Sequence, residues 1–368
     1  MMRSWFRWNS IFSFFWREKS YTLLFLTLVL CYGYLWLVTE SHDGEFTESS
    51  RVMAEYRLAE QKVQKDIERI GSIEKFLENK PLLNKVFNYL SFLATGAFSL
   101  GIIINFFLLF NPAWRRSLTL HDIPVGTTPW KISMFFKVLL LWIGASLILN
   151  FFIYLIRQIF FPQVPVNFFL LLHTTLSDIF CVCFIFFIIR EAGGHWRDLG
   201  LWVPKGKAIR EVVIGLGGYL AILPVFLSIL IFLAYVAGLF SYEPPPHPLV
   251  TVFLEEERRA PFLIFYSIFL AGILAPVFEE IFFRGFCYTL FKKQWGMMWG
   301  MVLSSALFAF IHQNTFAFWP IFILGMGMAY LYEKRRTLLP AIVLHVSHNL
   351  IFIGYFFFAK QVVNYGLV

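Results

Sequence analysis

The chain is organised around a polar stretch inside an apolar segment, Phe278-Glu279-Glu280-Ile281-Phe282-Phe283-Arg284. The surrounding residues, 262–286, have the length and the apolar composition of a membrane helix. A charged group in hydrocarbon costs about 3 kcal/mol on insertion scales, so such groups normally face a protein interior or a water-filled cavity. Glu280 and Arg284 are spaced i, i+4 in the order that favours a helical ion pair. Glu279 projects about 100° away from Glu280 around the helix, which leaves it available for another task.

The composition of the whole chain indicates a membrane protein. Of its 368 residues, 58% are hydrophobic and 15% are charged, and a soluble protein of this size could not bury so much apolar surface. We therefore expect an all-α fold, a polytopic bundle of about nine transmembrane helices. The apolar runs cover residues 21–38, 87–111, 135–156, 167–189, 212–240, 262–286, 297–313, 318–332 and 338–358. The first run is expected to be a retained helix, because no signal-peptide cleavage site follows it.

The basic residues indicate membrane topology rather than a nucleic-acid partner. The formal net charge is +8, but Lys and Arg fall mostly in short segments between the apolar runs. These basic segments are the N-terminus and residues 112–134, 190–211, 292–293 and 334–336. Because cytoplasmic loops carry an excess of Lys and Arg, we expect the N-terminus to lie in the cytoplasm.

Residues 39–82 form a long polar segment between the first two predicted spans. Apolar side chains recur in this segment at helical spacing, at Val63, Ile67, Ile70, Ile73 and Leu77. The pattern predicts an amphipathic helix that lies on the membrane or against the other helices. A coiled coil that binds a partner protein is the alternative.

Several glycines lie within the apolar runs, at Gly215, Gly217, Gly218, Gly325 and Gly327. No Lys-Ser or Lys-Thr follows them, as a phosphate-binding loop would require. We interpret them as positions where two helices pack closely.

Polar residues on two later spans have the positions needed to meet Glu279. Residues 292–296 predict a turn at the membrane surface. Glu279 lies about 12 residues before this turn and His312 about 17 after it, which is roughly 18 and 25 Å deep at about 1.5 Å per residue. The two side chains can therefore meet across an antiparallel hairpin. On the last span, His345 and Asn349 are spaced i, i+4 and share one helix face.

Each of these polar residues also has a structural interpretation. A single His in a span often serves packing, and a single Asn often forms an interhelical hydrogen bond. His348 projects away from the face that carries His345 and is given no role. His173 and Asp178, on an earlier span, lack partners in the sequence and are interpreted as structural.

Taken together, the polar residues form three motifs, Glu279-Glu280-x-x-x-Arg284, Phe308-x-x-x-His312 and His345-x-x-x-Asn349. The set resembles the CAAX prenyl protease type II family, the CPBP or Abi group of intramembrane proteases and bacteriocin-processing enzymes. The motifs follow the family's order along the chain. The resemblance implies that Glu280 and Arg284 support the helix that carries Glu279.

The resemblance covers roughly residues 135–358. It implies a CPBP-like protease core at residues 135–368, with residues 1–134 as an extension of two spans and the 39–82 loop. The implied function is an endopeptidase inside the lipid bilayer. Its substrate would be a membrane-associated peptide or protein, which in the family's eukaryotic use carries a prenyl group.

The resemblance also implies roles for four residues and leaves the cofactor open. Glu279 and His312 would activate a water molecule, while His345 and Asn349 would stabilise the oxyanion. Glu279, His312 and His345 are also residue types that bind a divalent metal such as zinc, which keeps an open position in catalytic sites. The metalloprotease motif His-Glu-x-x-His is absent from the chain, so we favour the metal-free mechanism.

Two other functions stay open at this point. A non-enzymatic immunity or scaffolding protein of the same fold would tolerate replacement of Glu279, His312 and His345. A proton-coupled transporter would use buried Glu and His side chains as a relay. The spans show no inverted repeat or paired broken helices, which argues against the transporter.

Overall fold

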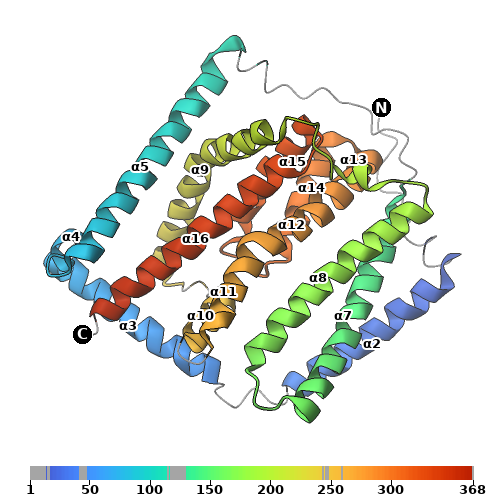
Figure 1. The fold of residues 1–368 in the computed structure, drawn as a ribbon, viewed down its shortest axis with the longest axis horizontal. Coiled ribbons are helices and arrows are strands. Elements are labelled where there is room, and N and C mark those ends of the chain that lie inside the picture. The colour runs from blue at the N-terminus through green and yellow to red at the C-terminus, as the bar shows by residue number, and fades with distance from the viewer. Residues whose placement is uncertain are drawn as a thin grey trace. The chain divides into compact units, whose positions relative to one another are not determined.

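The computed structural model describes residues 14, 17–40, 48–113, 116, 130–242, 244, 248–257 and 260–366. The described residues form an all-α fold, without a strand, and each predicted apolar run lies largely on helix (Figure 1). Among these residues, six helices are long and apolar enough to cross a membrane. Two shorter apolar helices are found at Lys19–Gly33 and Met297–Phe310. The fold class is confirmed, whereas the count of nine spans stays a prediction.

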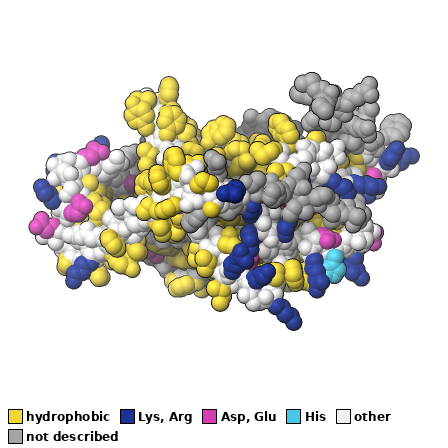
Figure 2. All heavy atoms as spheres, turned by 90° about the horizontal axis from the view of Figure 1, so that it is seen from above, with side chains coloured by type: hydrophobic (Ala, Val, Ile, Leu, Met, Phe, Trp, Pro, Cys, Tyr) yellow, Lys and Arg dark blue, Asp and Glu magenta, His cyan; other side chains and the backbone are white. Residues whose placement is uncertain are grey.

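The long helices expose much of their apolar surface. In the candidate span Pro81–Phe110 only 6% of the apolar window is buried within the protein. Figure 2 shows apolar side chains over much of the visible surface. Lipid can cover such side chains, and a helix satisfies its own backbone hydrogen bonds in hydrocarbon. These are the features of a multi-pass integral membrane protein.

The chain divides into two compact units, of which the first comprises Met1–Glu45, Ile123–Leu201 and Val277–Leu303. Within it α7 packs along α8, and the Trp142 indole N–H donates a hydrogen bond to Ser177 Oγ at 2.8 Å. The π-helical segment η3 packs on α8 and on the short 3₁₀ helix η1. The elements of this unit are α2 (Lys19–Glu40), α7 (Ile132–Phe160), α8 (Val166–Glu191), η1 (Trp196–Leu199), η3 (Ile281–Tyr288) and α13 (Thr289–Trp295).

The second unit comprises Phe46–Asp122, Trp202–Pro276 and Ser304–Val368. In it α9 packs against α5, α15 and α16. Its elements are α3 (Glu48–Ile70), α4 (Ile73–Phe76), α5 (Pro81–Phe110), α9 (Ala208–Leu239), α10 (Pro248–Glu256), α11 (Pro261–Phe269), η2 (Leu270–Leu274), α15 (Phe318–Arg335) and α16 (Leu339–Gly366). Two further helices contribute residues to both units, α12 (Ala275–Glu280) and α14 (Met297–Phe310). The predicted division between residues 134 and 135 follows motif content, and it stays a prediction.

A proline inside α9 shapes its contact with α5. Pro224 has no N–H, so the carbonyl oxygen of Leu220 loses its usual helical partner. Gly101 of α5 lies close to this point, and a Cβ on it would collide with Leu220 O and the Pro224 ring. One turn further on, Asn105 Nδ2 donates to Ala221 O at 2.7 Å. The side-chain amide and the missing Cβ together let the two helices pack closely around the proline.

The polar segment 39–82 contains an amphipathic helix that packs on other helices, as the first alternative predicted. Helix α3 contacts α10 and α16. Val63 and Leu77 are buried in one cluster with Val362 of α16. Residues 41–47 of this segment lie outside the described residues, as do residues 1–13 of the basic N-terminal segment used to predict orientation.

Only some of the glycines interpreted as packing positions make close contacts. A Cβ on Gly215 would lie 2.6 Å from Pro340 O and 2.8 Å from Val343 Cβ, and one on Gly218 would lie 2.8 Å from Leu331 Cδ1. Gly217 has open space instead, so the packing interpretation is wrong for that residue.

This difference predicts opposite effects of one substitution at two positions of α9. Gly215→Ala should destabilise the protein by about 1–3 kcal/mol, because the new Cβ overpacks the contact with α16. Gly217→Ala should be neutral or stabilising by about 0.5–1 kcal/mol, because alanine favours the helix. Thermal unfolding of the purified variants in detergent measures both. Equal destabilisation by the two substitutions would show that α9 and α16 do not pack this closely at Gly215.

Candidate active site

The predicted site residues are divided between the two units. Glu279, Glu280 and Arg284 belong to the first, and the two histidines and Asn349 belong to the second. We describe each set within its own unit. The meeting of the two sets in one pocket stays a prediction.

The Glu280–Arg284 ion pair is formed as its spacing predicts. Arg284 Nη1 donates to Glu280 Oε1 at 2.6 Å, and both side chains are completely buried. The guanidinium also lies over the Phe283 ring, 5.9 Å from its centroid. A buried ion pair requires close geometry to offset the loss of hydration, and this pair has it. The pair therefore fixes one side of the helix just beyond Glu279.

The backbone around this pair departs from the α-helix. Helix α12 ends at Glu280, and Ile281–Tyr288 continue as the π-helical segment η3. Every residue of η3 is buried. Single π turns inside helices occur frequently at functional sites. Here the π segment begins directly after the two glutamates.

Glu279 has different surroundings from its neighbour. It is partly exposed, whereas Glu280 is fully buried. An acidic side chain of α8, Asp178, interacts electrostatically with the Glu279 carboxyl group. Asp178 was interpreted from the sequence as structural because no partner was visible there. The only sign of a role in the sequence was that Asp178 is a single acidic residue inside an apolar run. Sequence spacing could not show which helix α8 packs against, so Glu279 could not be recognised as its neighbour.

The two candidate histidines share one aromatic neighbour. The Phe308 ring lies 4.9 Å from the His312 ring and 5.4 Å from the His345 ring, measured between centroids, and is close to perpendicular to both. Phe308 is almost completely buried, and His345 is 3% exposed. The motif Phe308-x-x-x-His312 thus brings α14 to the helix that carries His345. Both histidine rings thus lie beside Phe308, and their joint role in one site stays a prediction.

The hydrogen bond of His312 decides which nitrogen of its neutral ring carries the proton. Its Nδ1 lies 2.7 Å from the carbonyl oxygen of Phe308. A carbonyl oxygen only accepts, so Nδ1 carries the proton. In the neutral ring Nε2 is then the nitrogen with a free lone pair. His312 follows the end of α14 at Phe310, and Gln313 next to it adopts a positive φ of 50°.

Asn349 is engaged in an interhelical hydrogen bond. Its Nδ2 donates to Ala271 O at 2.8 Å. Ala271 lies in the π-helical segment η2, where carbonyl oxygens depart from the α-helical pairing pattern. This is the structural interpretation considered for a single Asn. Because an amide has two N–H groups, one remains for another acceptor.

The other intramembrane histidines have structural surroundings. The His348 ring lies 4.9 Å from that of Phe226 and 4.6 Å from that of Phe352. His173 Nε2 lies 3.2 Å from Ser146 Oγ and 3.1 Å from Ser146 O. The contacts of His173 agree with its structural interpretation, and those of His348, which was given no role, are packing contacts.

Among the residues that the structure describes, no group of three or more His, Cys, Asp or Glu side chains is arranged to hold a metal ion. The three candidate ligands, Glu279, His312 and His345, are divided between the units. The choice between a metal-free and a metal-dependent site therefore stays open.

One comparison with known proteins found a match to a family model. Residues 261–351 match the family model described as Rce1-like, type II CAAX prenyl endopeptidase Rce1-like. The matched segment contains Glu279, His312, His345 and Asn349, and it confirms the resemblance drawn from the three motifs. No curated protein and no solved structure gave a significant match.

Proposed function

From the Rce1-like domain at residues 261–351, we propose that the chain is an intramembrane endopeptidase. It hydrolyses a peptide bond of a membrane-associated peptide or protein, and the family description favours a substrate with a lipidated tail. The observation that carries the proposal is the contact of one buried ring, Phe308, with both His312 and His345. Ionisable side chains inside an apolar bundle are costly, which makes two histidines beside one buried ring candidates for a functional site.

The proposed reaction begins with a water molecule held by Glu279 and His312. Glu279 accepts a proton from the water, and the oxygen attacks the carbonyl carbon of the scissile bond. His312 holds the water through Nε2, because its Nδ1–H already donates a hydrogen bond to Phe308 O. The carbonyl oxygen gains negative charge, which His345 and the second N–H of Asn349 stabilise. The intermediate then expels the amine, which takes up the proton from Glu279.

The remaining motif residues act by positioning. The buried Glu280–Arg284 pair sets the orientation of the helix just after Glu279. The positive-inside rule, applied to the basic segments, further suggests a cytoplasmic N-terminus.

A matched pair of substitutions on α16 tests the role of His345. His345→Phe should lower the rate of cleavage by about 100-fold or more, because it removes a donor to the oxyanion and keeps an aromatic ring. His348→Phe, three residues away, should keep nearly full activity, because its ring already packs on Phe226 and Phe352. The assay is cleavage of a membrane-anchored peptide in proteoliposomes. Equal activity of the two variants would remove His345 from the mechanism.

Treatment with a chelator distinguishes the metal-free mechanism from the metal-dependent one. We expect activity to persist after exhaustive treatment with a chelator, because Glu279 and His312 supply the base without a metal. If a metal is required, Glu279, His312 and His345 would hold it, and it would activate the water as a Lewis acid. Loss of activity on chelation, with recovery on adding zinc, would overturn the metal-free form and keep the endopeptidase.

A further inference from the structure

Strained backbone in the described residues is found at three non-glycine positions. Ser241 and Gln313 each have a φ of 50°, and Arg336 has a φ of 58°. A Cβ makes this conformation costly, and glycine would avoid the cost. Strain of this kind recurs at active sites and ligand-binding turns, where the surrounding structure holds it in place. A side chain at such a position is therefore expected to make a contact that offsets the cost.

Arg336 makes such a contact within the chain, whereas Gln313 does not. Arg336 follows the end of α15, and its Nη2 donates to Glu333 Oε1 at 3.0 Å. The Glu333 side chain is only 1% exposed, so the arginine satisfies a buried carboxylate. The Gln313 side chain is exposed and forms no hydrogen bond with any other described residue. The contact at Gln313 is one that a bound molecule can supply.

The turn that carries Gln313 is fixed by hydrogen bonds on both sides of it. The Gln313 N–H donates to the carbonyl oxygen of Phe310 at 3.1 Å. The next residue, Asn314, accepts the Ala317 N–H at its Oδ1 at 3.0 Å. The backbone of Gln313 is thus held from both directions, and its amide is presented from an ordered turn. A preorganised contact of this kind loses less conformational entropy when a ligand binds.

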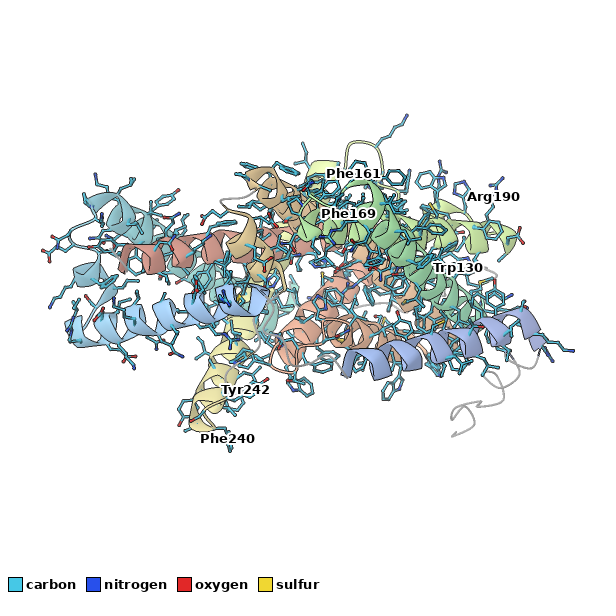
Figure 3. All side chains as sticks on the ribbon, turned by 90° about the horizontal axis from the view of Figure 1, so that it is seen from below. Trp130, Phe161, Phe169, Arg190, Phe240 and Tyr242 are labelled. Atoms are coloured by element: carbon cyan, nitrogen blue, oxygen red, sulfur yellow. The ribbon has the colours of Figure 1, made fainter. Side chains whose placement is uncertain are left out.

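A second strained turn adjoins this one. The Tyr242 hydroxyl lies 3.5 Å from Thr315 Oγ1, which makes a long hydrogen bond between the two turns. Tyr242 directly follows Ser241, beyond the C-terminal end of α9, where Figure 3 labels it. The strain at Ser241 and Gln313 is thus concentrated in two neighbouring turns of the second unit. Gln313 also follows His312 directly, so the strain lies beside a proposed catalytic residue.

We propose that Gln313 binds the main chain of the substrate beside the scissile bond, an inference that rests on the proposed endopeptidase function. A glutamine amide has two N–H donors and a carbonyl acceptor, so it can pair with the C=O and the N–H of one peptide group. Consecutive Cα atoms are about 3.8 Å apart, so Gln313 and His312 can contact neighbouring atoms of one bound peptide. Gln313 thereby holds the peptide next to the attacking water and takes no part in making or breaking bonds.

Two substitutions at this position separate the amide from the backbone strain. Gln313→Ala removes the amide and keeps the cost of the positive φ, whereas Gln313→Gly removes both. We expect each variant to raise KM about tenfold and to keep kcat within about twofold, because a binding contact is lost and the reacting groups remain. Gln313→Gly should unfold at a higher temperature than Gln313→Ala. The assay is cleavage of a membrane-anchored peptide in proteoliposomes, with thermal unfolding in detergent.

The matched control is Gln361→Ala, which should leave KM unchanged. Gln361 is exposed on α16, about 24 Å further along the helix axis than His345. An unchanged KM in Gln313→Ala, or an equal rise in Gln361→Ala, would overturn this inference and leave the endopeptidase in place. If Gln313→Ala does not fold, Gln313→Gly provides the same test. Absence of cleavage by the unmodified chain would remove the proposed function and this inference with it.

Discussion

Replacing Glu279 with Gln should lower the rate of peptide cleavage by about 10²–10⁴-fold while the protein stays folded. Glutamine has nearly the same shape but cannot accept a proton, so the variant loses general-base catalysis and keeps most of the packing. The measurement is turnover of a membrane-anchored peptide by the purified variant in proteoliposomes, with thermal unfolding as the check on folding. The expected fall is in kcat, because Glu279 is proposed to act on the reacting water.

As a control, the same change from Glu to Gln is made at Glu60, which lies outside the residues matched by the family model, 261–351. Glu60 lies on the exposed side of α3, and Glu60→Gln should leave turnover unchanged. If Glu279→Gln also turns over at the rate of the unmodified chain, the assignment of Glu279 as base is wrong. If neither protein cleaves peptides but the unmodified chain carries a proton flux that Glu279→Gln abolishes, the transporter explanation replaces the endopeptidase.

Breaking the Glu280–Arg284 pair should have the largest effect on stability. Removing one partner leaves an isolated charge fully buried in the bundle, which costs about 3–5 kcal/mol. We therefore expect Glu280→Met alone and Arg284→Met alone each to lower the free energy of unfolding by about this amount. The double substitution should be far closer to the unmodified chain, because no uncompensated charge remains. Unfolding of the three variants in detergent gives the coupling free energy directly.

The double variant also separates stability from catalysis. If it folds and still loses cleavage, the pair positions Glu279. If the two single effects simply add in the double variant, the ion pair does not stabilise the fold, and the 2.6 Å contact between Arg284 and Glu280 has no energetic consequence.

Several features were predictable because they depend on local spacing. Long apolar runs predict helices in lipid, where the backbone must satisfy its own hydrogen bonds. The i, i+4 order of Glu280 and Arg284 predicted their ion pair. The helical period of apolar residues in α3 predicted a helix with one apolar face, which packs on α10 and α16.

Other features depend on contacts between segments distant in sequence. The π-helical segments η2 and η3 are not predictable from the residues that form them, because no residue preference marks a π turn. Gly215 and Gly217 look equivalent in the sequence, but their opposite directions on α9 decide which of them meets α16. The hydrogen bond from Asn349 to Ala271 and the interaction of Asp178 with Glu279 require knowing which helices are neighbours.

Cross-linking between pairs of introduced cysteines tests the central prediction, that Glu279 lies close to His312 and His345. In a background where Cys31, Cys181, Cys183 and Cys287 are replaced, the pair Glu279→Cys and His312→Cys is treated with a short thiol cross-linker in the membrane. Efficient cross-linking is expected for this pair and for Glu279→Cys with His345→Cys, but not for Glu279→Cys with His348→Cys. Failure of both expected pairs in a folded protein would contradict a shared site and, with it, the proposed hydrolase.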